Sequence, residues 1–131
     1  MKKDIEIPKV ENVYVAVAHE WNEEFQGKDW NAYIINDRED TIETVLIVSK
    51  GYDGETKTAT FRHVIQALEP KSYGKIELMQ EDVLRLNNEF YVTFFAEGKM
   101  FEKKFIFRKN TINERAMQNL PVLEIDGVLC K

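Results

Sequence analysis

FYVTFFAEGKMFEKKFIF, residues 90–107, carries six of the eight phenylalanines of this 131-residue chain. Near its middle lies Glu97-Gly98, where glycine supplies the positive φ that a tight two-residue hairpin turn requires. Two aromatic strands that fold back at this turn are therefore predicted. The register counted from the turn pairs Phe94 with Phe101, Val92 with Lys103 and Phe90 with Phe105.

One face of this hairpin is expected to be core, because successive side chains of a strand point to opposite faces. The predicted core side chains are Phe90, Phe94, Phe101, Phe105 and Phe107. Lys103 breaks the apolar pattern on that face. Either a bulge shifts the register, or the Lys103 stem lies along the core while its ammonium reaches water at an edge.

The other face of the hairpin carries Phe95, Met100 and Ile106 among polar residues. Outward apolar side chains of this kind are available to receive another segment or another protein. We therefore take these three residues as part of a candidate interaction surface, covered either by the C-terminal segment or by a partner.

Length and composition predict one domain spanning residues 1–131. The chain is near the commonest domain size, and 44% hydrophobic with 31% charged residues is ordinary for a globular protein. The first ten residues, MKKDIEIPKV, lack the apolar segment of a secretory signal. A single cysteine, Cys130, is consistent with a reducing compartment. The expected location is therefore the cytoplasm, with no membrane segment.

Seven strands are expected, since segments of alternating or β-branched character recur between Gly, Pro, Asn and Asp. They cover residues 12–21, 30–36, 41–50, 56–68 and 74–79, followed by the two strands of the Phe-rich hairpin. A short helical turn is expected before the hairpin, within residues 79–88. With no strand–helix–strand rhythm, the pattern favours an all-β antiparallel sandwich with its core at about residues 12–108.

The C-terminal region has a different pattern. Thr111 followed by Glu114 matches a capping box, and Pro121 would end a helix, so a short helix is predicted at about residues 112–119. The apolar segment at about 122–130 is predicted to be a docked strand. It either adds to the chain's own sheet or docks on another molecule, and Val128 and Leu129 therefore join the candidate interaction surface.

Three stretches resemble bacterial immunoglobulin-like domains. They are YIINDREDTIETVLIVSKG (33–51), the corner at Leu68-Glu69-Pro70 leading into GKIEL (74–78), and NNEFYVTFF (87–95). The resemblance implies an immunoglobulin-like sandwich of about seven strands over residues 12–108. The chain lacks the Cys-Trp-Cys core of antibody domains, and the resemblance transfers no binding residue.

A search for catalytic and cofactor motifs identifies neither. Lys57-Thr58 follows two glycines, but a phosphate-binding loop needs a Gly directly before the Lys and a helix after it. His19 and His63 are the only histidines and have no neighbour at a metal-ligand spacing. Cys130 lies too near the terminus to be a rigidly held nucleophile. The sequence thus predicts no catalytic residue, no cofactor and no metal.

Charge is distributed unevenly along the chain. Residues 19–43 contain eight acids and two bases, whereas residues 97–115 contain six bases and three acids. Such asymmetry can steer self-association. A nucleic-acid adaptor is the third and least favoured hypothesis, because the net charge of −5 opposes phosphate binding.

Trp21, Phe25 and Trp30 lie around one charged turn and complete the candidate interaction surface. They form either a lid on one end of the sandwich or a recognition patch. The leading hypothesis is a non-enzymatic module that binds another protein or itself, for instance as a homodimer through an edge strand or the C-terminal tail. The alternative is a small-molecule binder, or an enzyme without a recognised motif, using a pocket near the Trp21–Trp30 end.

Overall fold

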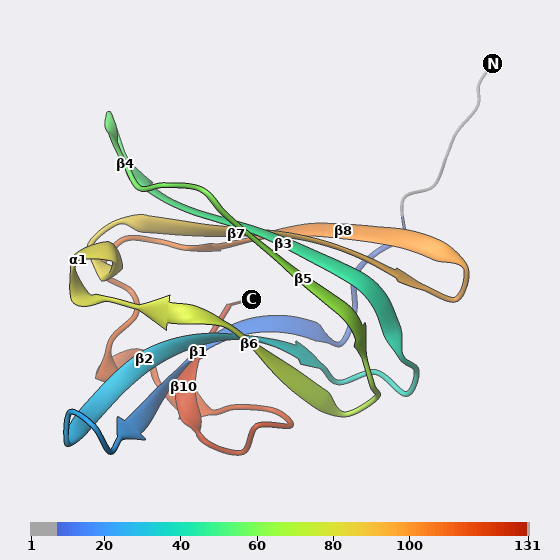
Figure 1. The fold of residues 1–131 in the computed structure, drawn as a ribbon, viewed down its shortest axis with the longest axis horizontal. Helices are drawn as coiled ribbons and strands as arrows, with labels where there is room; N and C mark the ends of the chain where they lie inside the picture. Colours follow the sequence, from blue (N-terminus) through green and yellow to red (C-terminus); the bar gives the residue numbers. More distant parts are fainter. Residues whose placement is uncertain (1–7, 131) are drawn as a thin grey trace.

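The computed structural model describes residues 8–130 and shows an all-β fold of two antiparallel sheets (Figure 1). The first sheet has the strand order β6-β2-β1-β10-β9, and the second has the order β5-β3-β7-β8, with β4 also paired to β3. The elements are β1 (Val13–Asn22), β2 (Gly27–Asn36), β3 (Ile42–Asp53), β4 (Thr56–Lys57), β5 (Phe61–Leu68), β6 (Ser72–Met79), α1 (Glu81–Leu84), β7 (Asn87–Ala96), β8 (Lys99–Phe107), η1 (Glu114–Ala116), β9 (Gln118–Asn119) and β10 (Asp126–Leu129).

The Phe-rich hairpin is β7–β8, and its predicted register is confirmed from Ala96–Lys99 through Phe90–Phe105. Both turn residues have positive φ, 53° at Glu97 and 71° at Gly98, which is the backbone twist that suits a two-residue hairpin. Pairing continues without a register shift past Lys103. The bulge expected as one explanation of Lys103 is therefore wrong. The Lys103 ammonium lies 4.9 Å from the centre of the Phe105 ring on the edge strand β8.

The core lies between the sheets, where alternate side chains of each long strand meet. The first sheet contributes Val13, Val15, Val17, Ala32 and Ile34, and the second contributes Ile42, Val45, Ile47, Phe90, Val92, Phe94, Phe101, Phe105 and Phe107. All of these side chains are almost fully buried. The five phenylalanines predicted to be core are confirmed as core.

The strand count differs from the seven expected. Ten strands are present among residues 8–130, of which β4, β9 and β10 have only two to four residues. The single strand expected at 56–68 is divided into β4 and β5. Thr58 causes this break because its hydroxyl accepts a hydrogen bond from the Gly51 N–H at 2.7 Å, and its own N–H donates to the Gly51 carbonyl at 2.9 Å.

The helix predicted at 112–119 is wrong. The segment forms only the 3-10 turn η1, capped by Asn113, and then pairs with β10 as β9. Ile112 and Leu120 are both almost fully buried. Tertiary packing and strand pairing override the local helical preference. The short helical turn expected before the hairpin is confirmed as α1.

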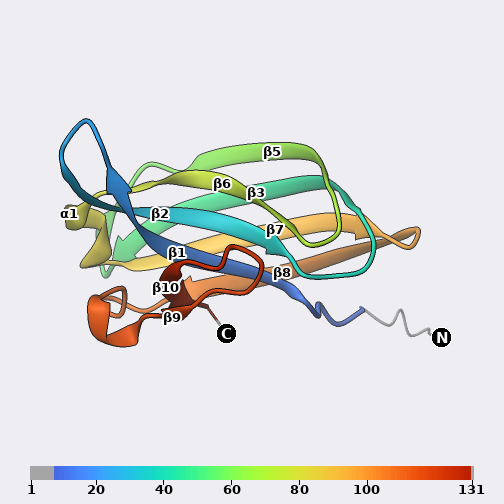
Figure 2. The ribbon, with the colours of Figure 1, turned by 90° about the horizontal axis from the view of Figure 1, so that it is seen from below.

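The C-terminal strand docks on the chain's own first sheet. Val128 of β10 pairs with Val17 of β1, and the loop before β10, residues 120–125, lies over the outer face of that sheet (Figure 2). A second hydrophobic cluster forms there from Ala16, Ala18, Tyr33, Ile35 and Leu120, with Tyr14, Val122, Leu123, Ile125 and Leu129 packed against it. The outer face of the first sheet is therefore largely covered by the chain itself.

The acidic residues that argue against a secretory signal, Asp4 and Glu6, lie outside the described residues.

Candidate functional site

The outer face of the second sheet carries the most extended set of exposed apolar side chains on one sheet surface. Leu46 is 42% exposed, Val64 57%, Phe95 45% and Met100 51%. We call these four residues the outer patch. Leu46 pairs with Val64 on β5, and Phe95 pairs with Met100 on β8. Ile106 lies on the same face and is half-buried. The predicted outward orientation of Phe95 and Met100 is thus confirmed.

Charges on this same face are paired with one another. The Glu89 carboxylate lies 3.7 Å from the Lys50 ammonium and 3.9 Å from the Lys104 ammonium. The Tyr91 hydroxyl donates a hydrogen bond to the Glu102 carboxylate. This bond, together with burial, raises the pKa of Tyr91 and keeps the hydroxyl protonated. The face therefore presents apolar groups among neutralised polar groups and has no strong net charge.

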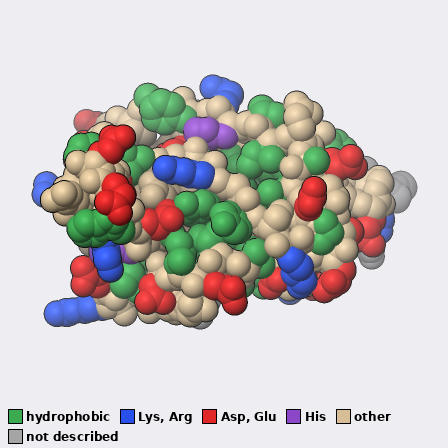
Figure 3. Space-filling view, turned by 60° about the horizontal axis from the view of Figure 1, so that its bottom comes forward, with side chains coloured by type: hydrophobic (Ala, Val, Ile, Leu, Met, Phe, Trp, Pro, Cys, Tyr) green, Lys and Arg blue, Asp and Glu red, His purple; other side chains and the backbone are tan. Residues whose placement is uncertain are grey.

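Val128 and Leu129 lie elsewhere. Val128 belongs to the main core, and Leu129 packs into the cluster outside the first sheet. The C-terminal segment thus leaves the outer patch open. Figure 3 looks toward the first sheet and shows hydrophobic side chains gathered in the middle of that face with acidic side chains around them.

The aromatic residues around the β1–β2 turn divide into two kinds. Trp21 and Phe25 are exposed, at 56% and 74%. Trp30 is half-buried, packs on the core, and stacks on His19 with ring centres 4.0 Å apart. Trp30 therefore covers this end of the sandwich as a lid. Trp21 and Phe25, at the same β1–β2 turn, are exposed and available to bind another molecule.

An open concavity of about 440 Å³ lies beside Trp21. Its acidic lining residues are Glu20, Glu23, Glu24 and Asp29, against one base, Lys75. The Glu20 carboxylate accepts hydrogen bonds from the Asn31 amide at 2.9 Å and the Tyr33 hydroxyl at 2.7 Å. Burial and then this carboxylate raise the pKa of Tyr33. The end of the sandwich at the β1–β2 turn is thus a negatively charged surface with two exposed aromatic rings.

His19 is expected to make the protein less stable in mild acid. Burial, and then repulsion from Lys28, lower the pKa of its ring from the ordinary 6.5, whereas Glu114 raises it less. The unfolded chain then binds the proton more readily, so this contribution to stability is complete above about pH 6.5 and is lost as the pH falls through the lowered folded value. Urea midpoints measured at pH 7.5 and 5.5 should differ, and His19→Phe, which keeps a ring on Trp30, should reduce that difference. An equal difference in the variant would show that other groups cause it.

His63 lies at a different place, at the open side between the sheets. Its Nε2 is 2.8 Å from the Glu77 carboxylate, and the same carboxylate oxygen accepts a hydrogen bond from the Ser49 hydroxyl at 2.6 Å. Sequence analysis did not identify Ser49 or Glu77. A bulge in β6 opposite Ala32–Tyr33 shifts the alternation and turns Glu77 inward, and residue patterns do not reveal such a shift.

Cys130 is held inside the fold rather than at a frayed end. Its N–H donates to the Val15 carbonyl at 3.0 Å, and its sulfur lies 3.5 Å from the Ile106 carbonyl. Burial raises the pKa of its thiol, which lowers the thiolate fraction and hence its reactivity. These features favour a structural role.

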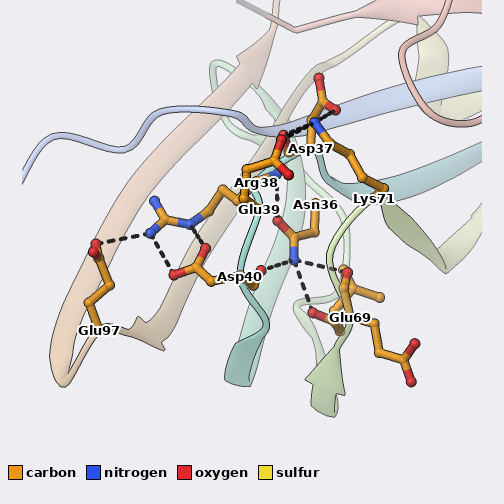
Figure 4. Close-up of polar contacts among 9 residues, drawn as sticks. Asn36, Asp37, Arg38, Glu39, Asp40, Glu69, Lys71 and Glu97 are labelled. Atoms are coloured by element: carbon orange, nitrogen blue, oxygen red, sulfur yellow. Dashed lines mark hydrogen bonds and ion pairs between the residues drawn. The ribbon is translucent and has the colours of Figure 1, made fainter.

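A polar cluster at the opposite end ties the two sheets together (Figure 4). Asn36 donates from Nδ2 to the carbonyls of Asp40, Leu68 and Glu69, each at 3.0 Å. Around it, Arg38 pairs with Asp40 and Glu97, and Lys71 pairs with Asp37 and Glu39. Much of the acidity of residues 37–40 is therefore neutralised within the chain. The other acids of residues 19–43, apart from Glu43, line the concavity at the β1–β2 turn.

Within residues 8–130, no helix is long and apolar enough to cross a membrane, and no group of three or more His, Cys, Asp or Glu side chains is arranged to hold a metal ion. Comparison with known proteins found no matching family model, curated protein or solved structure.

Proposed function

We propose that the protein is a non-enzymatic module that assembles with a second copy of itself through the outer patch. The observation that carries this proposal is the difference between the two outer faces. Residues 120–125 and Leu129 cover the middle of the outer face of the first sheet, where Tyr73 and Leu78 of β6 remain exposed, whereas Leu46, Val64, Phe95 and Met100 all stay exposed on the second. Exposed apolar side chains gathered on one sheet face, here as the neighbouring pairs Leu46–Val64 and Phe95–Met100, are typical of an interaction surface.

A second copy fits this face better than a highly charged partner does. In a two-fold dimer the same patch meets itself, so it must be self-complementary in charge as well as in shape. Acids and bases are mixed on this face, where Glu89 lies near both Lys50 and Lys104 and Glu102 accepts from Tyr91, and this mixture meets the condition. Two such sheets facing one another would resemble the packing of sheets inside a sandwich, with interdigitating side chains.

We further assign the sandwich to the immunoglobulin-like type. In the lettering of a constant-type domain, strands A, B and E share one sheet and C, F and G share the other. The order β1-β2-β6 in one sheet and β3-β7-β8 in the other supports this assignment. The chain departs from the constant type at β5, which lies beside β3 rather than β6, as strand C′ does in variable-type domains.

A single cysteine supports placement in a reducing compartment, the cytoplasm.

The second candidate function is the binding of a small molecule at the Trp21 end. The open acidic concavity with an aromatic wall favours it. Its ligand would be cationic, since carboxylates and an indole face both attract positive charge. Isothermal titration with a diamine such as putrescine would test this function, and Trp21→Ala should then weaken binding.

Substitution of Phe95 by lysine is expected to break the assembly. Phe95 lies in the outer patch at 45% exposure, so the change places a charge in the proposed interface with little effect on the core. We expect the dissociation constant of the dimer to rise about 30-fold or more, as for a hot-spot residue. Sedimentation equilibrium over a range of concentrations should show the wild type approaching twice 15.4 kDa and the variant remaining at 15.4 kDa.

Leu78→Lys provides the matched control. Leu78 is equally exposed, at 45%, but lies on β6 of the first sheet. The control should dimerise like the wild type. A wild type that remains monomeric at every concentration would overturn the proposal, as would equal loss of dimer in both variants. A chain beginning at Pro8 should still dimerise, because the proposed interface uses no earlier residue.

A further inference from the structure

A half-open crevice lies between the two sheets where β5 and β6 face each other. It encloses about 260 Å³ and is bounded by β3, β6, β7 and α1. Phe61, Leu78, Val83 and Phe90 supply apolar wall, and Ser49, Thr58, Gln80 and Asn88 supply polar groups. The combination of mostly apolar walls with a few placed polar groups is typical of small-molecule sites.

Glu77 is the only acidic residue that lines the crevice. Its Oε1 accepts from both the Ser49 hydroxyl and the His63 ring, so the carboxylate is fixed by one group from β3 and one from β5. Its side chain is 24% exposed. Among the described residues, no hydrogen bond or ion pair reaches Oε2. The carboxylate is therefore held in place by donors with one oxygen still able to accept.

No lysine or arginine of the crevice compensates the Glu77 charge. Lys50 is the only basic residue in the lining, and its ammonium lies 3.7 Å from Glu89 on the outer face of the second sheet. His63 donates a hydrogen bond to Glu77 from Nε2 in either its neutral or its protonated form. A partly buried carboxylate of this kind attracts a cationic hydrogen-bond donor.

We propose that the crevice is a binding site for a small primary amine with an apolar body. The ammonium would donate to Glu77 Oε2, and the body would lie against Phe61 and Phe90. The enclosed volume limits the ligand to roughly the size of one aromatic side chain with a short linker. This site is distinct from both the outer patch and the Trp21 concavity.

The test uses three probes that share a phenylethyl group and differ in the charge of the group attached to it. These are 2-phenylethylammonium, 2-phenylethanol and 3-phenylpropionate, titrated into the ¹⁵N-labelled full chain and followed by amide chemical shifts. The ammonium should cause saturable shifts at Gly51, Leu78 and Asn88, the alcohol should bind more weakly, and the propionate should not saturate. Equal binding of the ammonium and the propionate would overturn the proposal, as would shifts centred on Trp21.

Glu77→Gln should weaken ammonium binding about tenfold or more, because it removes the charge that the ammonium meets. Glu124→Gln is the control, since it removes the same charge from an exposed loop on the outer face of the first sheet, away from the crevice. Gln80→Lys leaves the Glu77 hydrogen bonds intact and places a cation at the mouth of the crevice, so it should also weaken ammonium binding. This variant tests the site if Glu77→Gln does not fold. Wild-type affinity in Gln80→Lys, or in a folded Glu77→Gln, would contradict the assigned site.

Discussion

A methyl group on Gly127 is expected to detach the C-terminal strand. A Cβ there would lie 2.7 Å from the Leu120 Cδ1, 2.8 Å from the Ala18 Cα and too close to the Val17 carbonyl oxygen. Two of these three atoms belong to the backbone of β1, which cannot move aside without disturbing the sheet. Overpacking of this kind costs about 3 kcal/mol of unfolding free energy.

Gly127→Ala should increase local opening around β10 as well as lower the stability of the whole fold. With β10 undocked, the cluster formed by Ala16, Tyr33 and Leu120 would be exposed to water. Amide hydrogen exchange should therefore accelerate at residues 118–130 in Gly127→Ala, and the urea midpoint should fall. Gly27→Ala is the matched control. Its Cβ would meet only the Phe25 carbonyl oxygen, at an ordinary 3.9 Å, so its stability should change by less than about 0.5 kcal/mol. Equal stability of the two variants would contradict the close approach at Gly127.

Replacement of Asn36 should produce the second large loss of stability. The side chain is fully buried and donates to three carbonyls that belong to two different corners, 37–41 and 68–71. Its Oδ1 also accepts from the Arg38 N–H at 3.0 Å. The Nδ2 group has two hydrogens for three carbonyls, so one hydrogen is shared between two of them. At about 1 kcal/mol for each of the roughly three hydrogen bonds, Asn36→Ala should lower the unfolding free energy by about 3 kcal/mol.

Asn36→Asp distinguishes loss of the Asn36 hydrogen bonds from loss of side-chain volume as the cause of the lower stability. Aspartate has nearly the same shape and retains an acceptor for the Arg38 N–H, but it presents an oxygen to the three carbonyls. It should therefore destabilise the protein at pH 7 at least as much as alanine does. Asn113→Ala is a surface control, since Asn113 caps only the short turn η1, and should cost about 1 kcal/mol. Near-native stability of Asn36→Asp would contradict the assigned donor role.

The parts of the fold that depend on local alternation could be predicted from sequence. Glu97-Gly98 determined the register of β7 and β8, because a two-residue turn admits only one pairing. Val13, Val15 and Val17 alternate along the sequence in the same way, and they form the inner face of β1. Phe95 and Met100 could be placed outside by the same alternation.

Features that depend on distant contacts could not be predicted. The β6 bulge that turns Glu77 toward Ser49 and His63 has no residue signature. The helical propensity of residues 112–119 gave the wrong element, because burial of Ile112 and Leu120 and pairing with β10 outweigh it. The crevice and the polar cluster around Asn36 are therefore visible only in three dimensions, whereas the outer patch was partly indicated by sequence.

The most direct test of assembly through the outer patch is an isotope-filtered NOE experiment on a mixture of ¹³C-labelled and unlabelled protein. Assembly through the outer patch should give intermolecular NOEs from the methyl groups of Leu46, Val64 and Met100 and from the Phe95 ring of the second copy, and none from the outer face of the first sheet. Intermolecular NOEs confined to Trp21 and Phe25, or their complete absence at millimolar protein, would contradict it.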